Sequence, residues 1–244
     1  MNQSLSSWLD AGRQFVGSMG CRSVCRLEYR LQRFTHVSER LMEYRFVFQA
    51  LQSTWPRTVL DVGTGTTALP SILRTCGFEV TAIDNIDKYW PRGMFNRHYH
   101  VIQDDIVDTR LRKEFDFITC ISVLEHSPDY LAAVRSMFGI LREGGHLVLT
   151  FPYNETTYIE DVYVLPGSGY GRDYSFGCQV FSREQIDQLM SENTATIVEQ
   201  EYWRVFTGDY WTFGERLETA QQVDRDAPHH MTCILCRKEA RDAG

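Results

Sequence analysis

The segment Thr58–Pro70 constrains the fold more than any other part of this chain. It begins with an apolar run, Thr58–Val62, that has the length of a buried strand, and it continues into a turn with glycine at positions 63 and 65. Glycine allows positive φ angles and lets a ligand approach the main chain, and the helix that follows such a turn presents unpaired N–H groups. The segment therefore predicts a strand, a turn and a helix that together bind a nucleotide.

The composition is that of a globular protein that acts on small molecules. The 244 residues are 43% hydrophobic and 23% charged, which suits one large α/β domain. The formal net charge of -7 disfavours a nucleic-acid partner, because such proteins usually present a basic face. No apolar run is long enough to cross a membrane and no secretion signal is visible, so we expect a cytoplasmic protein.

The cysteines are expected to be reduced and free of metal. Seven of them are scattered along the chain, which does not suggest a disulfide framework. Cys233 and Cys236 form a Cys-x-x-Cys pair, but they lie in an apolar run without the turn residues of a zinc knuckle. We therefore expect no zinc site.

The apolar pattern divides the chain into an N-terminal helical extension, residues 1–55, and a main domain, residues 56–244. Apolar residues at helical spacing from Glu39 to Leu51 predict an amphipathic helix, which Pro56 ends. Short apolar runs then alternate with helical patterns as far as residue 151, as is typical of a parallel sheet with crossover helices.

The C-terminal third has a different pattern. Ser182 and Gln185 predict a capping box that opens a helix to about Asn193. Strand-like runs at 196–206 and 231–237 can pair antiparallel at the edge of the sheet. Two segments show neither the helical nor the strand spacing of apolar residues, and we expect them to be functional loops: residues 153–180 and 207–228.

The glycine turn by itself fits two cofactors. The spacing of Gly63, Gly65 and Ala68 matches the dinucleotide fingerprint, with Asp84 about 20 residues on as a ribose ligand. Asp61 lies two residues before the first glycine, where a carboxylate would repel a pyrophosphate but attract the cationic amino group of a methionine moiety. Charge therefore favours S-adenosylmethionine over NAD.

From about residue 57 to residue 237 the chain resembles the class I, Rossmann-like methyltransferases that use S-adenosylmethionine. Five motifs occur in the family's order: Val59–Gly65, Thr81–Asn85, Val101–Ile106, Phe115–His126 and Leu141–Thr150. The resemblance implies an α/β fold with a mostly parallel seven-stranded sheet, helices on both faces and an antiparallel C-terminal edge hairpin. Thr67 stands where many members have a third glycine, so we expect a more open turn or a shifted helix start.

The resemblance places the cofactor, and its product S-adenosylhomocysteine, at the ends of the first strands. It implies that Asp84 holds both ribose hydroxyls, which suits a carboxylate that accepts two hydrogen bonds. Asp105 and Ile106 are assigned to the adenine, with Asp104 as the alternative one position earlier. The expected cofactor-binding residues are Asp61, Gly63, Thr64, Gly65, Asp84, Asn85, Asp104, Asp105, Ile106 and Ser122.

His126 is the candidate catalytic base. Transfer of a methyl group from a sulfonium requires alignment of the acceptor and, for a hydroxyl, removal of its proton. His126 follows the fourth strand, at the edge where ligands bind in open α/β sheets. The alternative is that Glu125 and His126 only hold the turn.

A metal-dependent version of the site is also considered. Ubiquinone-type O-methyltransferases resemble this chain around Glu125 and His126, and in them an acidic residue three positions before the glutamate helps these two bind a divalent ion. Ser122 occupies that position here, so we expect no metal.

Substrate contacts are expected from the parts that vary on this fold. Arg172 can clamp a phosphate or carboxylate bidentately, which suggests an anionic small molecule. The predicted substrate-binding residues are Tyr44, Tyr153, Arg172 and Tyr174.

The acceptor is the least constrained part of the sequence hypothesis. The segments Glu39–Val47, Tyr89–His98 and Arg172–Ser175 resemble bacterial methyltransferases of surface polysaccharides and sugars, which implies a hydroxyl of a sugar or glycolipid precursor. The alternatives are N- or phenolic O-methylation of a natural product, an NAD-linked enzyme, or a non-catalytic binding protein. The sequence leaves the oligomeric state open, a homodimer included.

Overall fold

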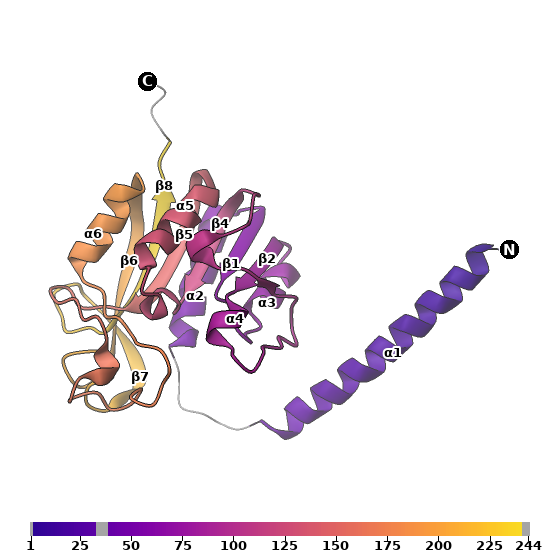
Figure 1. The fold of residues 1–244 in the computed structure, drawn as a ribbon, viewed down its shortest axis with the longest axis horizontal. Coiled ribbons are helices and arrows are strands. Elements are labelled where there is room, and N and C mark those ends of the chain that lie inside the picture. The colour runs from indigo at the N-terminus through magenta and orange to yellow at the C-terminus, as the bar shows by residue number, and fades with distance from the viewer. Residues whose placement is uncertain (1, 33–38, 241–244) are drawn as a thin grey trace. The chain divides into compact units, whose positions relative to one another are not determined.

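The computed structural model describes residues 2–32 and 39–240 (Figure 1). The chain forms two compact units, residues 1–36 and 37–244. The first unit contains helix α1 (Asn2–Arg30). Within the described residues, none of the helices combines the length and the apolar character needed to span a membrane.

The second unit is built on one eight-stranded sheet in the order β3-β2-β1-β4-β5-β8-β6-β7. Its first five strands are parallel, and β8, β6 and β7 each pair antiparallel with their neighbours. The strands are β1 (Thr58–Val62), β2 (Glu79–Asp84), β3 (Ile102–Gln103), β4 (Phe115–Ile121), β5 (Leu141–Pro152), β6 (Ala195–Phe206), β7 (Arg216–Val223) and β8 (Met231–Lys238). This confirms the expected mostly parallel α/β sheet with an antiparallel C-terminal edge.

The sheet has eight strands where the sequence predicted seven. The additional strand, β7, lies within the segment 207–228 that we expected to be a loop. β7 is an edge strand, none of its residues is fully buried, and polar residues occupy most of its positions. Its sequence therefore lacks the apolar alternation by which strands are recognised.

Helices cover both faces of the sheet (Figure 1). The α-helices of this unit are α2 (Arg40–Thr54), α3 (Leu69–Thr75), α4 (Ile86–Tyr89), α5 (Tyr130–Ile140) and α6 (Arg183–Glu192), and the 3-10 turns are η1 (Ile106–Asp108), η2 (Leu124–His126) and η3 (Val162–Val164).

The two cores follow from the alternation of side chains along the strands. Leu60 and Ile118 lie in the core that contains the buried faces of α5 and α6. Val59 and Phe117, their sequence neighbours, lie in the core that contains α2 and α3. Successive strand residues point to opposite faces, so each central strand contributes to both cores. Each buried side chain of this kind contributes about 1.5–3 kcal/mol.

Two predicted helix boundaries are confirmed. Helix α2 ends at Thr54, its C-cap Trp55 has a left-handed φ of 45°, and Pro56 follows. Helix α6 begins after Ser182, whose backbone N–H donates to Oε1 of Gln185 at 3.2 Å, and a capping box is present.

The arrangement places a site between β1 and β4. β2 and β3 lie on one side of β1, and β4 and β5 lie on the other, so the strand order reverses at this point. Connections leave the carboxyl ends of β1 and β4 in opposite directions there, and ligands of open α/β sheets bind in the crevice that results.

Candidate active site

The glycine turn after β1 has no room for a side chain. Gly63 and Gly65 have φ angles of 70° and 55°, a region that favours glycine. A Cβ atom on Gly63 would lie 2.3 Å from Cγ2 of Val123, and one on Gly65 would lie 3.2 Å from Cζ2 of Trp90. The turn is a backbone cradle of the kind that a nucleotide requires.

Thr67 is accommodated because the helix starts after it. Helix α3 begins at Leu69, with Ala68 as its N-cap. The side-chain amide of Asn96 donates to the carbonyl oxygens of Gly65 and Thr67, at 2.9 Å in both cases. The later helix start agrees with the expectation from the missing third glycine, and Asn96 supplies a clamp that the sequence did not reveal.

Asp61 lies in a small pocket together with Arg40 and Tyr44 of α2. Its carboxylate accepts hydrogen bonds of 2.7 Å from the hydroxyl groups of Thr64 and Thr119. Burial raises the pKa of Asp61 to about 6, although the hydroxyl groups and Arg40 oppose the shift. A carboxylate and a guanidinium in one pocket suit a ligand that carries both charges.

Ser122 is engaged in a buried network under α2. The Glu43 carboxylate, which is 0% exposed, accepts hydrogen bonds from Arg40 at 2.7 Å, Ser122 at 2.6 Å and Thr150 at 2.7 Å. This network ties α2 to the ends of β4 and β5. The hydroxyl expected to contact a cofactor thus has a structural partner instead.

Asp84 and Asn85 lie at the end of β2, beside the glycine turn. The Asp84 carboxylate accepts from the backbone N–H of Gly65 at 2.7 Å and from Nε1 of Trp90 at 3.2 Å. Burial raises the pKa of Asp84. The side-chain amide of Asn85 donates to Asp105 at 2.7 Å, so the ends of β2 and β3 are joined.

The two aspartates after β3 have different surroundings. Asp104 is buried and accepts from the Thr109 hydroxyl at 2.7 Å and from the backbone N–H of Arg110 at 3.2 Å. Asp105 caps the turn η1 through the N–H of Val107 at 3.0 Å. One pocket brings both of them together with the other predicted residues of this region, and its lining includes Gly63, Asp84, Asn85, Asp104, Asp105 and Ile106.

A larger pocket of about 510 Å³ lies beside His126. The turn η2 supplies one side, and the segment after β5 supplies the other. Three acidic residues, Glu125, Glu160 and Asp161, are among its lining residues, and the described lining contains no lysine or arginine. The pocket therefore suits a neutral or cationic molecule rather than the anion suggested by Arg172.

His126 presents a free ring nitrogen in this pocket. Its Nδ1 lies 2.8 Å from the carbonyl oxygen of Gly177. A carbonyl can only accept, so Nδ1 carries the proton, and in the neutral ring Nε2 is the basic atom. Burial lowers the pKa of His126, which keeps the ring neutral at pH 7. The Phe176 ring packs edge-on against it, with ring centroids 4.6 Å apart.

The segment that carries Gly177 is anchored on both sides. Oδ1 of Asp161 accepts from the backbone N–H groups of Tyr163 and Cys178, at 3.0 and 3.1 Å. The side-chain amide of Gln179 donates to the carbonyl oxygens of Leu124 and Ser127, at 3.3 and 2.8 Å. The loop and the turn η2 therefore hold each other in place.

The structure does not bring the four predicted substrate residues together. Tyr44 lines the Asp61 pocket instead of the larger one. Arg172 donates to the carbonyl oxygen of Pro166 at 2.9 Å, and Tyr174 is 53% exposed and packs against Tyr163. None of these three is among the residues that line the pocket beside His126.

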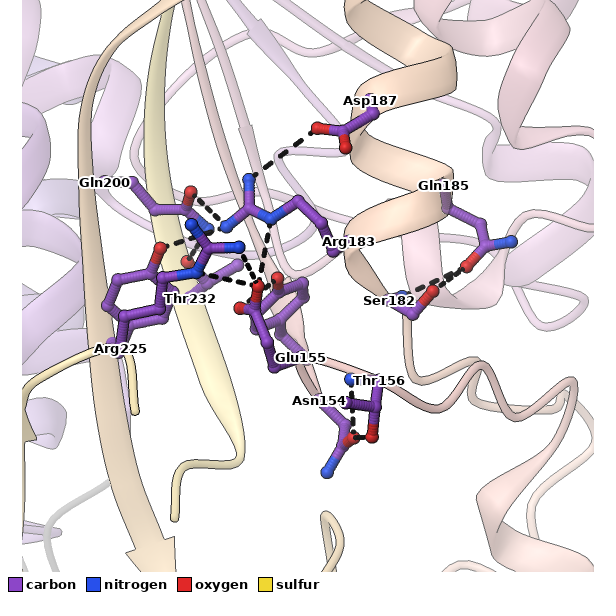
Figure 2. Close-up of polar contacts among 12 residues, drawn as sticks. Asn154, Glu155, Thr156, Ser182, Arg183, Gln185, Asp187, Gln200, Arg225 and Thr232 are labelled. Atoms are coloured by element: carbon purple, nitrogen blue, oxygen red, sulfur yellow. Dashed lines mark hydrogen bonds and ion pairs between the residues drawn. The ribbon is translucent and has the colours of Figure 1, made fainter. Parts of the chain in front are cut away.

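Tyr153 is a core residue. It is 0% exposed and its hydroxyl donates to Glu155 at 2.7 Å. Figure 2 shows the Glu155 carboxylate facing the guanidinium groups of Arg183 and Arg225, whose Nε atoms lie 3.3 and 2.8 Å from Oε1 of Glu155. This cluster joins the segment after β5 to α6 and to the β7–β8 connection, so Tyr153 serves packing here.

Several residues of the site were not recognised from the sequence. Arg40, Trp90, Asn96, Gly177 and Gln179 contribute to it through contacts between distant segments. For Gly177 and Gln179, the only signal in the sequence was their position in the irregular segment 153–180.

Known proteins share this fold and parts of this sequence. A family model described as a methyltransferase domain matches residues 29–200. The chain is 34% identical over 103 residues to a ubiquinone biosynthesis O-methyltransferase of Xanthomonas campestris pv. campestris (strain B100), an alignment that covers 38% of this chain and 41% of that protein. The chain thus spans about two fifths of the length of that relative. A protein of the same name from Hydrogenovibrio crunogenus is 24% identical over 203 residues, covering 80% and 69% of the two chains.

Two solved structures are similar in fold. The 1,6-didemethyltoxoflavin-N1-methyltransferase of Burkholderia thailandensis, solved with 1,6-didemethyltoxoflavin and S-adenosylhomocysteine, superposes with a TM-score of 0.53 at 17% identity and covers 93% of this chain and 87% of its own. An S-adenosylmethionine-dependent methyltransferase from Clostridium acetobutylicum gives a TM-score of 0.51 at 14% identity, covering 90% and 99%.

Proposed function

Since this chain belongs to the methyltransferase-domain family, we propose that it transfers the methyl group of S-adenosylmethionine to a hydroxyl of a small, oxygen-rich acceptor such as a sugar or glycolipid precursor. The observation that carries the hydroxyl assignment is the unprotonated Nε2 of His126 at the wall of a 510 Å³ pocket. A hydroxyl needs a base for methylation, and this atom can be one.

The residues at the strand ends fit the cofactor. Gly63 and Gly65 provide a turn on which a Cβ would collide with neighbours. Asp84 and Asn85 would hold the ribose, and Asp105 and Ile106 the adenine. Asp61 and Arg40 would hold the charged ends of the methionine moiety, with Thr64 and Tyr44 beside them.

Trp90 lies beside the proposed cofactor site. Its indole lies over Gly65 and donates to Asp84, the residue assigned to the ribose hydroxyls. Each carboxylate oxygen of Asp84 accepts one hydrogen bond and keeps a further acceptor site for a ribose hydroxyl, so Trp90 Nε1 and the ribose would share this carboxylate.

The chain's own residues have separate tasks in the reaction. When bound, S-adenosylmethionine would supply a methyl group on a sulfonium, and the electron pair of the broken carbon–sulfur bond would remain on sulfur. His126 takes the hydroxyl proton on Nε2, and the Gly177 carbonyl stabilises the resulting imidazolium through Nδ1. The hydrogen bonds of Asp161 and Gln179 hold Gly177 and the turn η2 in position.

Two features bear on the acceptor. The acidic residues of the pocket disfavour a phosphorylated acceptor, and the Glu160 carboxyl and the oxygen of the Tyr158 hydroxyl can accept hydrogen bonds from hydroxyl groups. The ubiquinone O-methyltransferases that the chain resembles are named for methylation at oxygen, which supports oxygen over nitrogen as the acceptor atom.

Calorimetry and a transfer assay test the proposal. We expect S-adenosylhomocysteine to bind with micromolar affinity, and we expect a labelled methyl group to pass from S-adenosylmethionine to members of a panel of neutral sugars and glycosides. Absence of heat at millimolar S-adenosylhomocysteine would sink the assignment of the cofactor. Methylation of amines alone would overturn the hydroxyl acceptor.

A further inference from the structure

A single side chain, that of Asn96, ties the segment between β2 and β3 to the glycine turn after β1. Its nitrogen donates to the carbonyl oxygens of Gly65 and Thr67, at 2.9 Å in both cases. Its oxygen accepts from the backbone N–H groups of His98 and Tyr99, at 2.8 and 3.0 Å. A side-chain amide has two N–H groups and an oxygen that accepts twice, so these four contacts use its whole capacity.

The segment that carries Asn96 is itself fixed on both sides of this residue. The Tyr99 hydroxyl donates to the carbonyl oxygen of Val80 in β2 at 2.7 Å. On the other side, the Trp90 indole donates to Asp84 at 3.2 Å. A side chain on a segment that is already fixed loses little further freedom when it forms its hydrogen bonds, so Asn96 holds the glycine turn at a low entropic cost.

The glycine turn needs such a partner because the helix after it starts late. Helix α3 begins only at Leu69, so the carbonyl groups of Gly65 and Thr67 lie outside the helix and are not paired by it. Gly65 has a φ of 55° and no side chain to restrict its backbone. The Asn96 amide pairs both carbonyl groups and thereby selects one conformation of a turn that glycine would otherwise leave free.

The conformation of this turn sets the direction of the Asp84 carboxylate. The backbone N–H of Gly65 donates to Oδ2 of Asp84 at 2.7 Å, while the carbonyl group of the same glycine accepts from Asn96. Asn96 is not among the described residues that line the two pockets at the strand ends. It therefore acts on a ligand through Gly65 and Asp84 and not by direct contact.

Resting on the cofactor assignment proposed above, we propose that Asn96 is a positioning residue that orders the glycine turn and, through Gly65, directs Asp84 at the ribose hydroxyls. In the dinucleotide fingerprint a third glycine allows the helix to pack closely. Thr67 stands at that position here, and Asn96 stabilises the longer turn that results. A turn that is ordered before the ligand arrives removes an ordering cost from binding.

Calorimetry with S-adenosylhomocysteine on the full chain tests this role. Asn96→Ala removes all four contacts, whereas Asn96→Asp keeps the two that the side-chain oxygen accepts and loses the two donated to the glycine turn. Asn154 provides matched controls, because its side-chain oxygen also accepts from two backbone N–H groups, those of Thr156 and Thr157, outside the proposed cofactor site. Denaturant unfolding of every variant measures stability separately from affinity.

We expect Asn96→Ala and Asn96→Asp each to weaken S-adenosylhomocysteine binding about tenfold, and Asn154→Ala and Asn154→Asp to keep it within about twofold. Combining Asn96→Ala with Asp84→Ala should weaken binding by less than the product of the two single losses, because both changes remove the same contact to the ribose. A residue that only stabilised the fold would lower the free energy of unfolding without this coupling to Asp84.

Three outcomes overturn the inference: unchanged affinity in Asn96→Asp, equal losses of affinity in the Asn96 and Asn154 variants, or a double variant whose loss equals the product of the single losses. Asn96→Asp keeps the contacts within its own segment, so it carries the test if Asn96→Ala does not fold. Wild-type binding is measured first. Absence of heat there refutes the proposed methyl transfer together with this inference, whereas any of the three outcomes after wild-type binding refutes only the role of Asn96.

Discussion

The imidazole Nδ1 of His126 and the carbonyl oxygen of Gly177 are 2.8 Å apart, although 51 residues separate them in the chain. This hydrogen bond fixes the tautomer in which Nε2 is basic. It also couples the turn after β4 to the irregular segment after β5. The protein thereby uses an irregular loop to orient a residue at the edge of the sheet.

Replacing His126 with alanine should lower turnover by about 10²–10⁴-fold, the usual contribution of a general base. Affinity for S-adenosylhomocysteine should stay within twofold, because His126 lies outside the proposed cofactor contacts. Steady-state kinetics and calorimetry measure the two quantities, and His100→Ala, an exposed histidine, is the control. Unchanged turnover would return His126 to a purely structural role.

The pH profile gives a second test of His126. Burial lowers its pKa below the ordinary value of 6.5. The neutral base is therefore present at and above pH 6.5 and is lost only as the pH falls through the lowered pKa. We expect the acid limb of kcat/KM to lie below pH 6.5, and a limb above that value would contradict the proposed environment of the ring.

Replacing Asp84 with alanine should weaken S-adenosylhomocysteine binding by more than about tenfold, since its carboxylate is assigned to both ribose hydroxyls. Asp87→Ala, an exposed acid on α4, serves as the control for calorimetry. An unaltered affinity in Asp84→Ala would mean that the ribose is held elsewhere.

Asp61→Asn should stabilise the protein above pH 6 and weaken cofactor binding. Burial raises the pKa of Asp61 from 3.8 to about 6 in the folded state, so ionisation destabilises the fold. This loss of folding stability, caused by the ionisation of Asp61, is absent below pH 3.8 and grows as the pH rises to 6. Above pH 6 it is constant, with an upper limit of about 3 kcal/mol. Urea denaturation of wild type and Asp61→Asn between pH 4 and pH 8 measures the difference in their free energies of unfolding. If that difference did not change with pH, the raised pKa of Asp61 would be ruled out.

Alanine substitutions at two glycines with positive φ angles distinguish the cost of backbone strain from the cost of a steric collision. A Cβ on Gly77, with φ of 101°, would meet no atom within 4 Å, so Gly77→Ala should cost only the backbone strain of about 1–2 kcal/mol. Gly63→Ala adds a collision with Val123, which should cost about 1–3 kcal/mol more. Denaturant unfolding measures both variants. Equal losses of unfolding free energy in the two variants would show that Val123 moves aside at no cost. The double variant Gly63→Ala, Val123→Ala should then be no more stable than Gly63→Ala.

The sequence by itself determined the central sheet and the positions at its strand ends that we propose for the cofactor. Asp61, Gly63, Gly65 and Asp84 lie within or directly after short strands, where apolar periodicity and glycine turns are local signals that survive without a structure. The same reasoning predicted the end of α2 at Pro56 and the capping box of α6, because both depend on residues a few positions apart.

The tertiary structure decided which side chains surround the pocket beside His126. Tyr153 and Arg172 were plausible substrate residues by position, yet one is packed in the core and the other donates to nearby carbonyl groups. Gly177 and Gln179 acquired their roles through contacts across more than 50 residues. Strand β7 was missed for a related reason, since an edge strand of polar residues is defined by its hydrogen-bonded neighbour and not by its own pattern. Local patterns specify elements and turns, whereas burial, protonation and pocket lining arise only when distant segments meet.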